Sequence, residues 1–252
     1  MTPRNADPFF VGYFSKTPPR IRNFALLAGV TIIGFLATMA LLLPLGTIDP
    51  GPGRYADDLR GGTLPGVIDP LPYPILRVPA ANGAPARAVL LGGQDKSGAQ
   101  DRVDVGSRGV EVGGVFVRRG DIEMLLVATD GIKASTEGLQ AFAPAAIEDL
   151  GRWQLTGEIC DGKCYGGAMK PGTGLAHKAS ANLCILSGLP PVLVMELPVE
   201  GSTVVLLADE DVGPIPEALY DLTAIPIRLV GHLERRDDLL IFRIDESTAE
   251  TM

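Results

Sequence analysis

Residues that could do chemistry gather in one stretch of this 252-residue chain, residues 157–184. The stretch holds all three cysteines, Cys160, Cys164 and Cys184, and one of the two histidines, His177. Thiolate sulfur and imidazole nitrogen are ligands for zinc and copper, and two thiols can instead join as a disulfide. The spacing of these residues therefore indicates either a metal centre or a disulfide.

The candidate metal set is Cys160, Cys164 and His177. A fourth ligand from Cys184 fits poorly, because residues seven apart on a helix lie about 10 Å apart along its axis. A Cys-x3-Cys pair followed by a histidine is similar to the pattern in copper-delivery proteins of the respiratory chain. That similarity implies copper as the ion.

The candidate disulfide joins Cys164 to Cys184 and would tie a helix back to the end of a strand. It would close a loop of about 20 residues and stabilise the fold by about 3 kcal/mol in the chain-entropy model. Cys160–Cys164 is the alternative pairing, and the two exclude each other because both use Cys164. We expect no reactive thiolate at Cys184, because the C-terminal end of a helix carries partial negative charge.

A glycine-rich turn, Pro171-Gly-Thr-Gly174, precedes the helix expected over residues 175–186. Free amides at a helix start can bind an anion, and lysines lie on either side of this turn. The candidate anion site and a simple solvated loop are both compatible with the pattern. The residues of the candidate site are Lys163, Lys170, Thr173 and Gly174.

The same stretch resembles a motif of uncharacterised exported, membrane-anchored bacterial proteins. The matching residues read Gly157-Glu-Ile-x-Asp-x-x-Cys164-Tyr, then Pro171-Gly-x-Gly-x-x-His177, then Ala181-x-x-Cys184. The resemblance covers about 35 residues and implies an exported, anchored protein without assigning an activity. In this chain Ser180 stands where the motif has a further cysteine, and Cys160 stands where it has an apolar residue.

The positioning elements begin with an apolar run at the N-terminus. No charged residue lies between Arg22 and Asp49, which predicts a transmembrane helix over residues 23–46. Basic residues dominate the flank before it, so residues 1–22 should be cytoplasmic and the remainder exported. The run is longer than the apolar core of a cleaved signal peptide. We expect residues 23–46 to cross a bacterial inner membrane once and to contact the lipid. The C-terminal part that follows should be periplasmic.

Beyond the membrane, the chain is expected to be mainly β with a few short helices. Proline and glycine crowd residues 47–74, which predicts an extended linker. Strand-like runs then form a first β unit with a helix over 136–150, and a second, OB-like unit with the cysteine-containing insert. The expected boundaries are 75–150 for the first unit, 151–247 for the second and 248–252 for the tail.

The chain also resembles itself. Residues 110–127 align with residues 227–244, with Gly114/Gly231, Arg118/Arg235, Arg119/Arg236 and Asp121/Asp238 identical. Both segments read as a β-hairpin with a polar turn, and residues 89–91 echo residues 205–207. The pattern predicts either two related OB-like barrel units or two unrelated hairpins of similar composition.

A net charge of −8 argues against a nucleic-acid-binding protein, which needs clustered lysine and arginine. No short motif for a nucleophile, a metalloprotease or a dinucleotide loop is present. The favoured hypothesis is a non-catalytic accessory or assembly protein, a subunit or partner of an inner-membrane complex. The alternative is a copper-handling or thiol-redox factor using Cys160, Cys164 and His177, and an enzyme of other chemistry ranks third.

Overall fold

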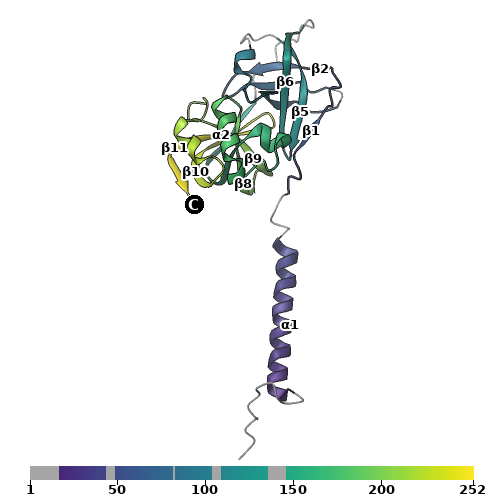
Figure 1. Cartoon of the computed structure of the whole chain (residues 1–252), viewed down its shortest axis with the longest axis vertical. Coiled ribbons are helices and arrows are strands. Elements are labelled where there is room, and N and C mark those ends of the chain that lie inside the picture. The colour runs from purple at the N-terminus through teal and green to yellow at the C-terminus, as the bar shows by residue number, and fades with distance from the viewer. Residues whose placement is uncertain (1–16, 44–48, 82, 104–108, 136–145) are drawn as a thin grey trace, which may run out of the picture. The chain divides into compact units, whose positions relative to one another are not determined.

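The computed structural model describes residues 17–43, 49–81, 83–103, 109–135 and 146–252 (Figure 1). The chain divides into two units, residues 1–48 and 49–252. In the first, helix α1 (Pro19–Leu42) opens with a proline at its first turn, where a missing amide hydrogen is tolerated. None of its residues is buried, and it is long and apolar enough to cross a membrane, a test that a signal sequence would also pass.

The second unit contains two sheets. Strands β1 (Arg54–Ala56), β2 (Thr63–Asp69), β3 (Ile75–Val78), β4 (Arg87–Gly93), β5 (Val110–Arg119) and β6 (Ile122–Ala134) form the first. Their order is β1-β5-β2-β3-β4-β6, and β5 also pairs with β6. Strands β4 and β6 run parallel, while the other pairs are antiparallel.

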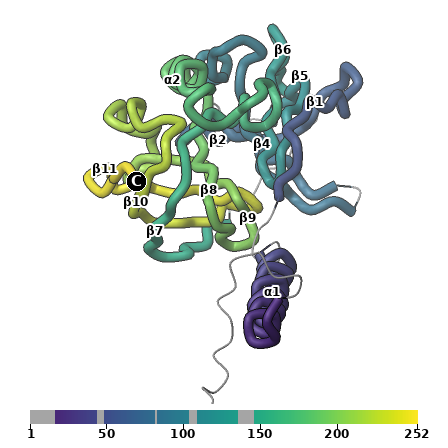
Figure 2. The backbone as a smooth tube through the Cα atoms, turned by 60° about the horizontal axis from the view of Figure 1, so that its bottom comes forward, coloured from purple at the N-terminus to yellow at the C-terminus, as the bar shows by residue number. Residues whose placement is uncertain are grey.

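The second sheet contains β7 (Ile147–Asp161), β8 (Pro191–Val199), β9 (Ser202–Ala208), β10 (Pro226–Arg236) and β11 (Leu239–Thr251). These strands close in the order β10-β11-β9-β8-β7, because β10 pairs with both β11 and β7. Strands β9 and β11 run parallel. Figure 2 shows β7–β11 grouped beside the strands of the first sheet within residues 49–252.

Two expectations need correction. Residues 47–74 do not form one linker, because β1 and β2 lie within that range and pair with β5. Residues 147–150 are not helical, because β7 begins at Ile147 and pairs there with Arg236. The remainder of the helix expected over 136–150 lies outside the described residues. The helix expected over 175–186 is present as the short turn η4 (Leu175–His177) followed by α2 (Lys178–Leu186).

The two aligned segments adopt the same hairpin geometry. Gly114 pairs with Val127 in β5–β6, and Gly231 pairs with Ile244 in β10–β11. Each glycine lies close to the opposite strand: an added Cβ would come within 2.2 Å of a carbonyl oxygen, of Leu126 and Arg243 respectively. The requirement for glycine at these positions therefore has the same steric cause in both hairpins.

Alternate residues of β6 and β9 pack into two different hydrophobic cores. In β6, Leu125 and Val127 pack inside the first sheet, whereas Met124 packs between the sheets. In β9, Leu206 also packs between the sheets, while its neighbours Val205 and Leu207 pack inside the second sheet. Because neighbouring strand residues point to opposite faces, both faces of these strands are buried. This explains their nearly continuous apolar sequences.

Polar contacts add to this joint between the sheets. The turn between β10 and β11 carries Asp237 and Asp238. Asp237 accepts a 2.7 Å hydrogen bond from Arg77 Nε, and Asp238 accepts one of 2.6 Å from the Ala88 amide. The β10–β11 hairpin of the second sheet is therefore bound to β3 and β4 of the first sheet.

Gly114→Ala should destabilise the full-length protein by more than about 1 kcal/mol, because the new methyl group meets the Leu126 carbonyl. Gly113→Ala is the matched control, since its Cβ would meet only ordinary contacts at 3.6 Å or more. Urea unfolding in detergent measures both. Equal midpoints for the two variants would contradict the close approach at Gly114.

Candidate functional site

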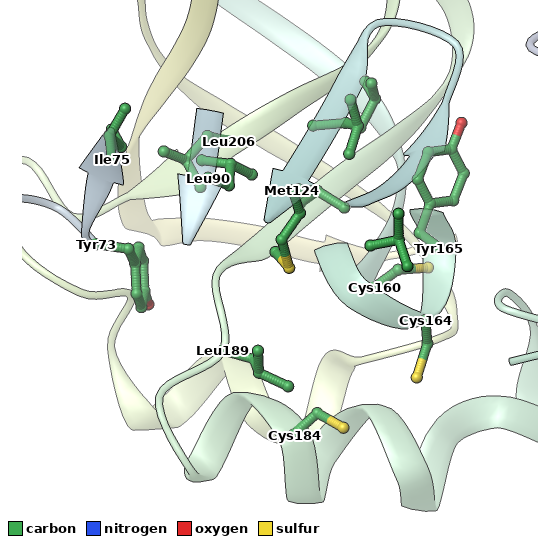
Figure 3. Packing of buried hydrophobic residues seen from close by; sticks show 14 of the residues in the cluster. Tyr73, Ile75, Leu90, Met124, Cys160, Cys164, Tyr165, Cys184, Leu189 and Leu206 are labelled. Atoms are coloured by element: carbon green, nitrogen blue, oxygen red, sulfur yellow. The ribbon is translucent and has the colours of Figure 1, made fainter. Parts of the chain in front are cut away.

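The chemistry-bearing residues lie at the end of β7 and in the connection between β7 and β8. This connection contains the short helical segment η3 (Cys164–Ala168), then η4 and α2. Its side chains form part of the apolar cluster between the two sheets (Figure 3). The candidate site is therefore built from the end of one strand and from three short elements packed against it.

Asp161, the last residue of β7, organises the connection. Its side chain is fully buried, and its Oδ1 accepts a 2.9 Å hydrogen bond from the Cys164 amide at the start of η3. Its Oδ2 lies 2.9 Å from Nε2 of His177, which is also fully buried. A buried carboxylate needs such partners, because burial without them disfavours the charged form strongly. Asp161 thus holds η3 and η4 against the end of β7.

Cys164 and Cys184 meet beside this carboxylate. Both are buried free thiols, and Figure 3 shows their side chains directed toward each other from η3 and α2. Their sulfur atoms lie within 4.8 Å of each other, and this contact together with burial raises the pKa of Cys164. The structure therefore has the two thiols as neighbours, while the disulfide between them stays a prediction.

Cys160 does not join this pair. Its thiol donates a 3.0 Å hydrogen bond to Glu158 Oε1, and burial raises its pKa. The expected ligand set of Cys160, Cys164 and His177 is therefore not assembled around one point. Among the described residues, the group of three potential ligand atoms that all lie within 4.8 Å of one another belongs to Asp161, Cys164 and Cys184. His177 faces this group only through Asp161.

The expected anion site is not assembled either. The Lys163 ammonium is buried and donates to three backbone carbonyls at and just after the end of β4, those of Gly93, Gln94 and Asp95. The Gly174 amide donates to Glu158 Oε1 at 2.8 Å, so an internal carboxylate takes the place of an external anion. The other two expected residues, Lys170 and Thr173, line a surface hollow with Arg119 and Tyr165.

Two residues that organise this stretch, Asp161 and Glu158, were not singled out from the sequence. Asp161 accepts a hydrogen bond from the amide of Cys164, three residues later in the chain. This is the spacing of an aspartate that caps the start of a helix. That spacing could have revealed its role. Nothing local in the sequence indicates that Glu158 would meet the Gly174 amide 16 residues later.

The arrangement is closed to large substrates. Asp161, His177 and the three cysteines each expose 6% or less of their surface. These groups can hold one another, form a disulfide or bind a small ion. They do not present a nucleophile and a base to a cleft at the surface.

Lys163→Met should destabilise the protein by about 1–3 kcal/mol, because it leaves the buried Gly93 carbonyl without its donor and removes two further bonds, to the carbonyls of Gln94 and Asp95. Lys170→Met makes the same chemical change at an exposed lysine and should stay within about 0.5 kcal/mol of the parent. Thermal and urea unfolding of the full-length protein compare the two. A loss shared equally by both variants would contradict the role assigned to Lys163.

Comparison with known proteins gives no match: no family model, no curated protein and no solved structure corresponds to this chain. The functional argument therefore rests on the residues and their geometry.

Proposed function

We propose that this protein is a membrane-anchored, non-catalytic accessory or assembly protein that binds an exported surface of an inner-membrane complex. The observation that carries the proposal is the contrast between the two kinds of surface. The reactive side chains are buried and engaged with one another, whereas apolar side chains on one helix face point outward.

That outward face lies on η4 and α2. Leu175, Leu183 and Leu186 are 71%, 49% and 62% exposed, and Ala179 between them is also exposed. Residues 171–195 carry one charged side chain, Lys178, whose ammonium donates to the Asp221 carbonyl. An uncharged apolar face of this kind is typical of protein–protein contact surfaces.

Helix α1 supports a location in the membrane, where the proposed partner complex lies. Helix α1 is apolar on all sides, and its hydroxyl groups at Thr31 and Thr38 bond to carbonyls one turn earlier in the same helix. Basic residues before the helix favour a cytoplasmic N-terminus and an exported remainder, the periplasm in a Gram-negative cell. On this reading α1 stays in the inner membrane as a single pass.

The exported part is inferred to consist of two related OB-like barrels. In both sheets the third and fifth barrel strands run parallel, β4 with β6 and β9 with β11. In both, the fourth strand closes the sheet by pairing with the first, β5 with β2 and β10 with β7. This is the strand order of a five-stranded Greek-key barrel. Barrels of this kind often bind ligands, and the fold by itself does not determine one chemistry.

The cysteine pair is assigned a structural role in this scheme. In an oxidising compartment Cys164 and Cys184 would form a disulfide that fixes α2, and with it the apolar face, to η3. Copper handling through Cys160, Cys164 and His177 is less well supported, because those side chains are engaged with different partners.

Purification of the full-length protein from its own membrane in mild detergent tests the proposal. We expect a native mass well above 26.5 kDa, with other polypeptides present. Leu183→Asp should release them, because a charge on the apolar face opposes its burial. Leu197→Asp is the matched control, since Leu197 is 67% exposed on β8, outside that face. A wild-type monomer, or equal loss in both variants, would contradict the proposal.

A further inference from the structure

Three potential ligands converge in the interior between the sheets. A carboxylate oxygen of Asp161 and the sulfurs of Cys164 and Cys184 lie within 4.8 Å of one another, and all three residues are buried. From this convergence we propose that the dithiol form of the protein binds one thiophilic divalent ion of the Zn²⁺ type at these three residues. The site is distinct from the set expected from the sequence.

The donor types and their separation suit such an ion. Zinc binds thiolate sulfur at about 2.3 Å and carboxylate oxygen at about 2.0–2.2 Å, which places neighbouring ligands of one ion roughly 3.5–4 Å apart. The three atoms need only a small contraction to reach these distances. Two sulfurs with one carboxylate favour a borderline ion such as Zn²⁺ over Mg²⁺ or Ca²⁺, which prefer oxygen ligands alone.

The charges around the site also balance. Two thiolates and one carboxylate carry three negative charges, and a divalent ion supplies two positive charges. The buried Lys163 ammonium, which precedes Cys164 in the chain and donates to three carbonyls, supplies the third. Binding replaces the two thiol protons, which leave to solvent, with the ion, and no net charge remains buried.

The carboxylate is held in place from outside the cluster. Asp161 Oδ2 lies 2.9 Å from His177 Nε2, and His177 Nδ1 lies 3.3 Å from Met169 Sδ. Partners of this kind orient a ligand before the ion arrives, and their loss typically weakens metal binding by about 10–100-fold. His177 is therefore a positioning residue in this site and not a ligand.

The metal and the disulfide use the same two sulfurs, so one excludes the other. The proposal concerns the reduced protein and does not depend on the accessory role. Loss of the membrane partner in one experiment and loss of metal binding in another would be separate results.

Cobalt(II) titration of the full-length protein tests the site, because thiolate-bound cobalt absorbs through charge transfer from sulfur. The protein is kept in detergent, without oxygen and with a phosphine reductant. We expect the absorption to saturate at one cobalt per chain and to disappear when one equivalent of Zn²⁺ is added. No charge-transfer absorption in the reduced wild-type protein would overturn the proposal.

Matched cysteine variants identify the ligands. Cys160→Ser should keep the full signal, because its thiol bonds to Glu158 outside the cluster. Cys184→Ser should lose it, and His177→Gln should keep the sulfur absorption while weakening zinc affinity by about 10–100-fold. Circular dichroism of each metal-free variant checks its folding. A folded Cys184→Ser protein with the full signal, or its loss in folded Cys160→Ser, would also overturn the proposal.

Discussion

The connection that carries the cysteines depends on one buried carboxylate. Asp161 lies at the end of β7 with no exposed surface, so its charge must be compensated inside the protein. It is compensated by the Cys164 amide and by His177, two groups from different short elements. The positions of η3 and η4, and through them of α2, follow from this requirement. The meeting of Cys164 with Cys184 is a consequence of the same interaction.

This carboxylate lies where two sheets share a core. Strands β6 and β9 send alternate side chains into their own sheet and into the joint between the sheets. The connection packs into that joint, and Lys163 extends across it to the carbonyls of residues 93–95. Polar groups buried in this joint fix the position of one sheet against the other. Any shift that left one of these groups without its hydrogen-bond partner would cost free energy. The same burial keeps the reactive groups away from large substrates.

Features with local or repeated signals could be predicted from the sequence. The hairpins of residues 110–127 and 227–244 were predicted from their shared glycine and turn residues, and the helix near 175–186 from its flanking glycines. The expected helix over 136–150 was wrong at residues 147–150, because pairing of Ile147 with Arg236, 89 residues later, decides that segment. The prolines of residues 47–74 suggested a linker, although Pro65 lies within β2, opposite Glu111.

The candidate site was predicted in part for similar reasons. Cys160 and Asp161 are neighbours on a strand, so their side chains point to opposite faces, and only Asp161 faces Cys164. Spacing along the chain alone could not indicate which of the two would join the cluster. The Cys164–Cys184 disulfide, expected because it would tie the helix back to the strand end, stays a prediction, and the structure has both residues as buried free thiols within 4.8 Å of each other.

The central claim is that the fold brings Cys164 and Cys184 together and keeps Cys160 apart. Mass-spectrometric mapping of the cysteines tests it most directly, on full-length protein oxidised in air with any remaining thiols then alkylated. The account predicts a Cys164–Cys184 linkage and an alkylated Cys160. A Cys160–Cys164 linkage, or three alkylated cysteines, would contradict it.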